Sequence, residues 1–405
     1  MSHHAEHVDP NAWRGGGNKV GAVDAEVGSG YNMLHLFPDE LRLVGAGSSK
    51  SANEITVYNA DATVSDVLSG HKSMVLSVAT DGVIIASGAG GGDVKLWKAD
   101  TLEEVGQRRH GSPVYGLALS GDLLVSGGTD KTAKLWSIAE PASGEDCTAT
   151  LDEHEGCVFC VDVTSDSEEM GMVIATGSGD NSAKLWSRDG GASLHTLWHP
   201  RHVLALRIEG DVLATGCVDG IVRTFSVASG EQTRELLGHR AAVTCVGFAT
   251  SLHFHRQKAA TQDNYAGECH VSLVSGAFDG HLKVWSLTEE TSKETEDLEG
   301  TKAVECLATV FDDARLNGGL RGVALSPSHG IVAALACGIK GTPGSPKRAS
   351  RGSERVSVRT RASMESEQSE DVAGELQIWE AAGEETLAFD NGPCPRSKVR
   401  LEPVV

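Results

Sequence analysis

Histidine, a hydroxyl residue and aspartate recur together along this chain, and the same residue types form the base, nucleophile and acid of many hydrolases. A Ser or Thr lies ten residues before an aromatic side chain in five stretches, at Ser87, Ser126, Thr176, Thr215 and Ser275. In the last four stretches an Asp follows the hydroxyl by four residues, and a His precedes every stretch. Because catalysis needs one exposed nucleophile beside an oxyanion hole, five copies indicate a packing role in each repeat and no enzyme.

Other residues with chemical potential follow no functional pattern. Cys157 and Cys160 form a C-x-x-C pair, but residues three apart on a strand face opposite sides and no second pair accompanies them. The remaining metal-capable residues have no zinc-site spacing or lie in a terminal segment without supporting structure; they are His253, His255, Cys269 and His270, and His3, His4 and His7. Phosphate loops and nucleophile elbows are also missing. We therefore expect no metal and no cofactor.

The elements that carry these residues are hairpins. The stretch from Leu123 to Ile138, LLVSGGTDKTAKLWSI, holds two apolar runs joined by a turn-forming segment. Similar hairpins end at Trp97, Trp186, Phe225 and Trp285, and 39 residues separate Trp97 from Trp136 as well as Trp186 from Phe225. A repeat of about 40 residues with four short strands is typical of a propeller blade.

A His, three variable residues and a strand-opening Val precede the hairpins, as in HGSPV from His110. With the hydroxyl, the Asp and the Trp, this pattern resembles the WD-repeat (WD40) family of β-propellers from about Tyr31 to Phe389. The resemblance implies a buried tetrad in each blade, in which the indole donates to the hydroxyl and the His links the hydroxyl to the Asp. Complete tetrads are expected at His110, Ser126, Asp130 and Trp136; at His154, Thr176, Asp180 and Trp186; and at His239, Ser275, Asp279 and Trp285. Phe225 lacks the indole donor, and Gly91 stands where the second repeat would have its Asp.

The resemblance predicts an all-β fold, a seven-bladed WD40 β-propeller of four-stranded antiparallel blades. Its third-strand aromatic residues would be Tyr58, Trp97, Trp136, Trp186, Phe225, Trp285 and Trp379. We expect a disordered arm over 1–30, the propeller over 31–390 and a tail over 391–405. Inserts are expected at 249–270 and 288–300 and, as a disordered segment, at 339–375, and an outer strand of the sixth blade at 303–310. Either residues 384–390 or residues 19–27 could close the ring.

Composition limits the partners and the compartment. The chain has 405 residues, 40% of them hydrophobic, with 48 Gly and a net charge of -21. This charge disfavours general attraction to nucleic acid or to an anionic membrane. No apolar run approaches the ~20 residues that span a bilayer, and nine scattered Cys suit a reducing compartment. We expect a cytoplasmic or nuclear protein, a monomeric propeller that acts within a larger complex.

The resemblance implies an interaction scaffold or adaptor, because the fold itself supplies no chemistry. Family members bind partners through residues beside the strand-opening Val and before the turn Asp. Those positions here are Asn32, Leu34, Met74, Leu76, Pro113, Tyr115, Thr129, Cys157, Phe159, His202, Leu204, Val218, Ala242, Thr244, Phe278 and Arg321. We expect capture of an unphosphorylated peptide or domain edge with Tyr115, Phe159 and Phe278 as anchors, unless several of these side chains only line the central channel.

Two other roles stay open, and the insert adds a hypothesis about control. Short first-to-second strand turns are similar to those of ubiquitin-ligase substrate receptors of the F-box/WD-repeat type, although the residues before the propeller are too few and too polar for an F-box. A scaffold for RNA processing or ribosome assembly would instead have a basic face. Within 339–375, kinases could modify Thr342, Ser345, Ser350 and Ser363, which follow basic residues or precede Pro.

Overall fold

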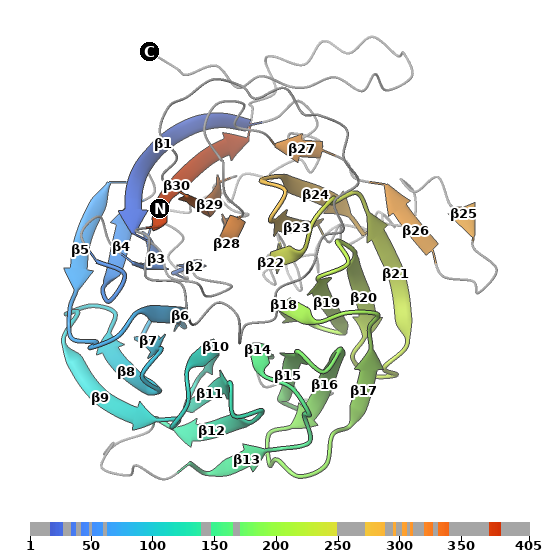
Figure 1. Cartoon of the computed structure of the whole chain (residues 1–405), viewed down its shortest axis with the longest axis horizontal. Coiled ribbons are helices and arrows are strands. Elements are labelled where there is room, and N and C mark those ends of the chain that lie inside the picture. Colours follow the sequence, from blue (N-terminus) through green and yellow to red (C-terminus); the bar gives the residue numbers. More distant parts are fainter. Residues whose placement is uncertain are drawn as a thin grey trace, which may run out of the picture.

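The computed structural model describes residues 17–26, 34–37, 42–47, 51–59, 63–138, 147–164, 171–248, 272–287, 295–296, 302–305, 308–310, 320–326, 331–339 and 372–381. All regular elements in these ranges are β-strands. Figure 1 shows them as twisted sheets arranged in a ring around a central axis, with β2, β6, β10, β14, β18, β22 and β28 innermost. No helix of the described part is long and apolar enough to cross a membrane.

Six of the described sheets are four-stranded and antiparallel, and in each of them three consecutive strands form a meander. Four of them consist of consecutive strands: β2 (Leu34–Leu36), β3 (Arg42–Ala46), β4 (Ile55–Asn59) and β5 (Val64–Leu68); β6 (Val75–Thr80), β7 (Ile84–Ala89), β8 (Asp93–Lys98) and β9 (Glu104–Arg109); β10 (Val114–Ser120), β11 (Leu123–Gly128), β12 (Ala133–Ser137) and β13 (Ala149–Leu151); and β14 (Val158–Val163), β15 (Val173–Ser178), β16 (Ser182–Ser187) and β17 (His195–Trp198). The other two recruit distant strands: β22 (Val243–Phe248), β23 (Ser272–Ala277) and β24 (Leu282–Ser286) pair with β27 (Ala308–Val310), and β28 (Leu320–Ser326), β29 (Ile331–Ile339) and β30 (Val372–Ala381) pair with β1 (Gly17–Glu26).

The remaining sheet overturns the prediction of seven four-stranded antiparallel blades. It has six strands, β18 (Val203–Glu209), β19 (Val212–Cys217), β20 (Val222–Ser226), β21 (Gln232–Leu237), β26 (Lys302–Glu305) and β25 (Thr295–Glu296). β26 pairs with β21 in parallel, from Arg234 opposite Lys302 to Leu237 opposite Glu305. The outer edge of β21 has unpaired backbone N–H and C=O groups, and β26 pairs with them. The next strand along the chain, β27, then pairs with β24 in the following sheet. The single outer strand expected over 303–310 is therefore two strands in two different sheets.

The N-terminal strand β1 closes the ring. It pairs antiparallel with β30, and Lys19 lies opposite Trp379 in the register. Of the two alternatives for closure, the structure shows the one at 19–27, whereas 384–390 lies outside the described residues. The expected disordered arm over 1–30 is wrong for 17–26, which is a strand, and the expected 339–375 insert begins and ends inside strands β29 and β30.

Apolar side chains between neighbouring sheets form the core. Trp285 of β24 belongs to one buried cluster with Val222 and Leu236 of the preceding sheet. Trp136 and Val94 share another cluster across the sheets β6–β9 and β10–β13. The inner strands are therefore buried on both faces, as in β11, whereas outer strands such as β5 and β9 are largely exposed.

Candidate protein-binding face

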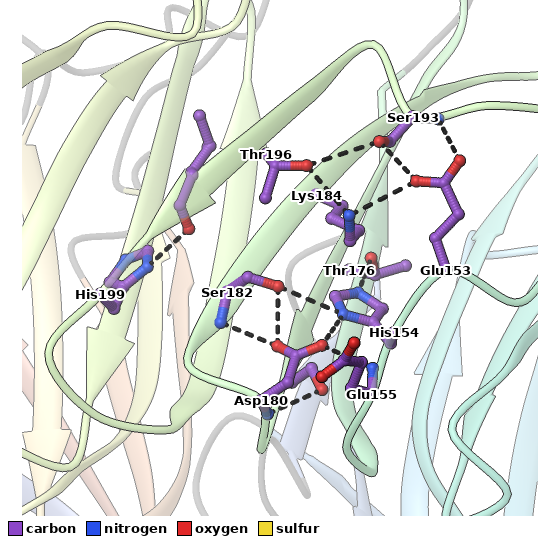
Figure 2. Close-up of polar contacts among 12 residues, drawn as sticks. Glu153, His154, Glu155, Thr176, Asp180, Ser182, Lys184, Ser193, Thr196 and His199 are labelled. Atoms are coloured by element: carbon purple, nitrogen blue, oxygen red, sulfur yellow. Dashed lines mark hydrogen bonds and ion pairs between the residues drawn. The ribbon is translucent and has the colours of Figure 1, made fainter.

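A buried chain of hydrogen bonds crosses the sheet β14–β17 (Figure 2). Trp186 Nε1 donates to Thr176 Oγ1 over 2.9 Å. The Thr176 hydroxyl lies 2.7 Å from His154 Nε2, and His154 Nδ1 lies 2.7 Å from an Asp180 carboxylate oxygen. The carboxylate also accepts from the Ser182 hydroxyl and the Glu155 amide. The four residues expected as one tetrad thus lie in contact, and they join the third strand to the loop before the first.

The other two expected tetrads have the same arrangement. Ser126 Oγ accepts from Trp136 Nε1 over 2.8 Å and lies 2.8 Å from His110, whose other ring nitrogen is 3.1 Å from Asp130. In the sheet that starts with β22, His239 lies 2.8 Å from Ser275 and 3.2 Å from Asp279, and Trp285 donates to Ser275. The hydroxyls of Ser126, Thr176 and Ser275 are fully buried. A nucleophile that no substrate can reach has no catalytic use, so these groups stabilise the fold.

A further tetrad was missed in the sequence. His71 lies 2.7 Å from Ser87, and Trp97 donates to Ser87 over 3.0 Å. The carboxylate comes from Asp93, 2.5 Å from His71, although Gly91 occupies the position where the other repeats have Asp. The available signal was an Asp six residues after the hydroxyl, at the far end of the same turn.

The six-stranded sheet replaces the tetrad with a different network. His199 lies 2.8 Å from Thr215, but Phe225 offers no indole donor to that hydroxyl. The other ring nitrogen of His199 contacts the Leu197 carbonyl. Asp219, expected to face the His, instead forms an ion pair with Arg223 at 2.9 Å.

Burial keeps several of these imidazoles neutral. It lowers the pKa of His199 from 6.5 to about 4. It also lowers the pKa values of His71 and His110, although Asp93 and Asp130 act in the opposite direction. A neutral ring carries one N–H, so in these tetrads the ring donates to the carboxylate and accepts from the hydroxyl. Every polar group then has a partner, and none is free to donate a proton.

One end of the ring is built from paired loops. In five sheets a backbone amide near the second-to-third strand turn donates to the loop before the first strand: Gly90 to Met74, Thr129 to Pro113, Gly179 to Cys157, Val218 to His202 and Phe278 to Ala242. The turn Asp residues lie in the same turns. We call this end the top face, defined by these two sets of loops.

A β-bulge at the start of six inner strands sets the direction of the next side chains. The register shifts directly after the first residue of β6, β10, β14, β18, β22 and β28. The extra residues are Leu76, Tyr115, Phe159, Leu204, Thr244 and Arg321. A bulge re-aims a side chain that regular pairing would hold in the sheet. All six positions were expected on the face, and the bulge is the feature that distinguishes them.

The face residues divide into exposed and buried groups. Phe278 and Met74 are 39% and 38% exposed, and Pro113, Phe159, His202, Val218 and Arg321 are partly exposed. Leu34, Leu76, Tyr115 and Leu204 are buried, as is Thr244. Asn32 lies outside the described residues. Tyr115 is therefore no exposed anchor; it lines the channel with His35, Ser77 and Arg207.

Aromatic contacts and an ion pair connect the sheets across the channel. The Tyr115 and Phe159 rings meet edge to face at 6.1 Å, and Phe159 lies 6.3 Å from His202. The Arg321 guanidinium lies 4.6 Å from the centre of the Phe278 ring. Within the channel, Arg207 of β18 contacts Asp162 of β14 at 3.2 Å and His35 of β2 at 3.1 Å.

Groups with metal or redox potential add no second site to the described part of the chain. No cluster of three His, Cys, Asp or Glu residues there could hold a metal ion. Cys157 contacts the Thr129 carbonyl, and burial raises the pKa of its thiol. The 249–270 insert with its His and Cys residues lies outside the described residues, as do Thr342, Ser345, Ser350 and Ser363.

Comparison with known proteins agrees with this geometry. A family model described as WD domain, G-beta repeat matches residues 62–98, 104–137, 145–187 and 230–286. Nuclear distribution protein PAC1 of Zygosaccharomyces rouxii is 31% identical over 29% of this chain and 26% of its own length. Ribosome biogenesis protein YTM1 of Eremothecium gossypii is 30% identical over 26% of this chain and 19% of its own length. The chain therefore spans about a quarter or less of these relatives.

A solved structure shows the same fold over a larger part. A chain of the crystal structure of the mitotic checkpoint complex superposes with a TM-score of 0.62, covering 82% of this chain and 92% of that one at 18% identity. Hairpins at near-40-residue spacing, buried His, hydroxyl, Asp and Trp tetrads and the family match all agree. The chain is a β-propeller in which four stretches match the WD-repeat family model.

Proposed function

We propose that this protein is a non-catalytic interaction scaffold or adaptor that binds protein partners on its top face. The observation that carries the proposal is the exposure of Phe278 and Met74 at that face, which also includes the partly exposed Phe159. Aromatic and Met side chains that remain accessible around a rigid opening are typical of interface centres. Rigid loops support this role, because a pre-organised surface loses little entropy on binding.

The anchor residues that we propose differ from those expected from the sequence. Tyr115 is buried, so its removal would disturb the channel before it disturbed a partner. Phe278, Phe159 and Met74 are the anchors we propose instead. Val218, Pro113 and His202 would form the surrounding contacts.

Affinity purification with mass spectrometry tests the proposal. We expect Phe278→Ala combined with Met74→Ala to lose a defined group of copurifying proteins. Trp198→Ala is the matched control, because Trp198 is 71% exposed but lies on β17 at the outer rim of the ring. An unchanged set of proteins in the double variant, with the Trp198 variant behaving identically, would refute binding at the top face.

A role in ribosome assembly is a second candidate because of the similarity to YTM1, a ribosome biogenesis protein. It predicts copurification of pre-ribosomal RNA and nucleolar or nuclear location in fluorescence imaging. The similarity to PAC1, a nuclear distribution protein, carries no RNA expectation. Copurification that is sensitive to RNase would favour the role in ribosome assembly. Protein partners that all remain bound after RNase treatment would favour a scaffold without RNA.

The four candidate phosphosites remain a prediction. Each phosphate would add about -1.5 to -2 charge close in sequence to β29 and β30 of the ring. We expect Ser350→Glu with Ser363→Glu to change partner affinity relative to the unmodified chain. Equal affinities in these two forms and in a chain lacking residues 342–369 would remove the hypothesis.

A further inference from the structure

One sector of the top face has a charge pattern that the whole chain does not share. Arg201 precedes β18, Arg240 precedes β22 and Arg321 is the second residue of β28. Their three sheets are neighbours in the ring, since the inner strand β18 contacts β22 and β22 contacts β28. Phe278 lies within this sector under the guanidinium of Arg321. We call Arg201, Arg240, Arg321 and Phe278 the arginine sector.

Two arginines of this sector face solvent, Arg321 is partly exposed, and the carboxylates of the sector are engaged. Arg201 and Arg240 are exposed, and no ion pair within the described residues involves either side chain. Asp279 is 8% exposed and accepts hydrogen bonds from His239 and from the Arg240 and His281 amides. Asp219 is paired with Arg223. The sector therefore offers cations to a ligand, although the chain has a net charge of -21.

The sheet next to this sector has the opposite character. The loop before β14 carries Asp152, Glu153 and Glu155, all exposed, and the turn between β15 and β16 carries Asp180. Glu153 is held by Lys184 and Ser193 (Figure 2). The Asp152 side chain has no partner among the described residues. The inner strand β14 contacts β18, so these carboxylates adjoin the Arg201 end of the sector, and unlike charges side by side favour a single orientation of a charged ligand.

Resting on the proposed function, we propose that the arginine sector binds an extended acidic segment of a partner protein. Carboxylates along the segment pair with the guanidiniums of Arg201 and Arg240, which bind carboxylates in bidentate geometry. An apolar side chain of the segment packs on Phe278, whose ring the Arg321 guanidinium holds in place. The three arginines come from three sheets, so they suit carboxylates distributed along a chain and not one phosphate in one pocket.

Synthetic peptides and the full-length protein test this assignment. The first probe is a fluorescent peptide of about ten residues in which Glu and Asp surround a central Phe. The second replaces every Glu and Asp by Gln and Asn, and the third replaces the Phe by Ser. We expect anisotropy to show the first peptide binding at least about tenfold more tightly than the others, with the advantage lost at about 1 M salt, where the Debye length falls from about 8 Å to about 3 Å.

Matched variants locate the site. Arg201→Gln with Arg240→Gln should weaken the acidic peptide at least about fivefold, the range for two partly exposed ion pairs. Lys72→Gln with Arg109→Gln removes the same charge from exposed positions in the loop before β6 and at the end of β9, outside the sector, and should leave the affinity within about twofold. Equal losses of peptide affinity in both double variants would overturn the assignment of binding to the arginine sector, because the affinity would then depend only on net charge.

Two further outcomes separate this inference from the proposed function. If a phosphoserine peptide bound and the carboxylate peptide did not, the acidic-segment assignment would be wrong. If the Phe278→Ala and Met74→Ala variant lost its protein partners while no peptide preferred the arginine sector, the scaffold would stand and the sector would not. Unchanged melting temperatures of the Arg variants show that the losses concern binding and not folding.

Discussion

Replacing Thr176 by Val probes the buried network most directly. The change keeps the shape of the side chain and removes the hydroxyl between Trp186 Nε1 at 2.9 Å and His154 Nε2 at 2.7 Å. Both partners then lack a hydrogen bond in a site from which water is excluded, because Thr176 and Trp186 are 0% exposed. An unsatisfied buried group costs about 1–3 kcal/mol, so two such groups predict a loss of about 2–6 kcal/mol.

The six-stranded sheet provides the matched control. Thr215 is also fully buried, but its hydroxyl contacts only His199 Nε2 at 2.8 Å and the Arg223 carbonyl at 3.3 Å, because Phe225 has no N–H to satisfy. Thr215→Val should therefore cost about 1–3 kcal/mol, roughly half the loss at Thr176. The difference between the two variants is more reliable than either value, because both changes replace a hydroxyl by a methyl group of similar volume.

Urea unfolding followed by Trp fluorescence measures both losses, with hydrogen exchange of β15 and β19 amides as a local readout. A repeat protein can unfold in steps, and the local readout keeps the comparison valid in that case. A Thr215→Val loss equal to or larger than the Thr176→Val loss would contradict the reasoning. It would mean that the indole bond contributes nothing to stability.

Three other predictions concern pH, close packing and the channel. Burial lowers the pKa of His199 from 6.5 to about 4, so the unfolded chain binds the proton first as pH falls. The free energy of unfolding should therefore decline by up to about 3 kcal/mol between pH 6.5 and pH 4. Urea midpoints across this window measure the decline, and His199→Gln should make the midpoint less dependent on pH. Gly116→Ala should cost about 1–3 kcal/mol, because a Cβ there would lie 2.8 Å from the Val161 amide nitrogen. A Cβ at Gly90 would come no closer than 3.7 Å to the Met74 carbonyl, an ordinary contact, so Gly90→Ala should leave the melting temperature almost unchanged. Asp162→Asn should cost about 2–3 kcal/mol by weakening the bonds to Arg207 and to the Ile208 amide. Asp122→Asn, which breaks an exposed pair with Arg188, should cost under about 1 kcal/mol. Similar urea midpoints for these two variants would refute the importance of the channel ion pair.

Much of the hairpin framework could be predicted because its contacts are local. The ten-residue spacing from Thr176 to Trp186 is the length of one tight hairpin between two paired strands. Such spacing can be counted in the sequence, so the tetrad partners at His110, His154 and His239 were identified together with their hydroxyls. Asp93 was missed because a turn of another length can deliver a carboxylate to the same imidazole.

The sequence could not indicate which expected face residues are accessible. Tyr115, Phe159 and Arg321 occupy equivalent bulge positions after the first residue of an inner strand, yet Tyr115 is buried and the other two are partly exposed. Exposure there depends on the size of the side chains that the other sheets direct at the same opening. Phe159, for example, packs against both Tyr115 and His202.

By itself, the sequence determined the all-β class, the repeat family and the hydrogen-bonded partners within each hairpin, because these depend on residues fewer than about 50 positions apart. Only the tertiary structure decided that β1 closes the ring on β30, that β26 extends the neighbouring sheet in parallel, and that the sheets are not seven uniform four-stranded blades. The physical reason is that the edge of a sheet accepts any strand that satisfies its backbone groups. Backbone hydrogen bonds carry no side-chain code, so which distant segment reaches the edge follows from how the whole ring packs.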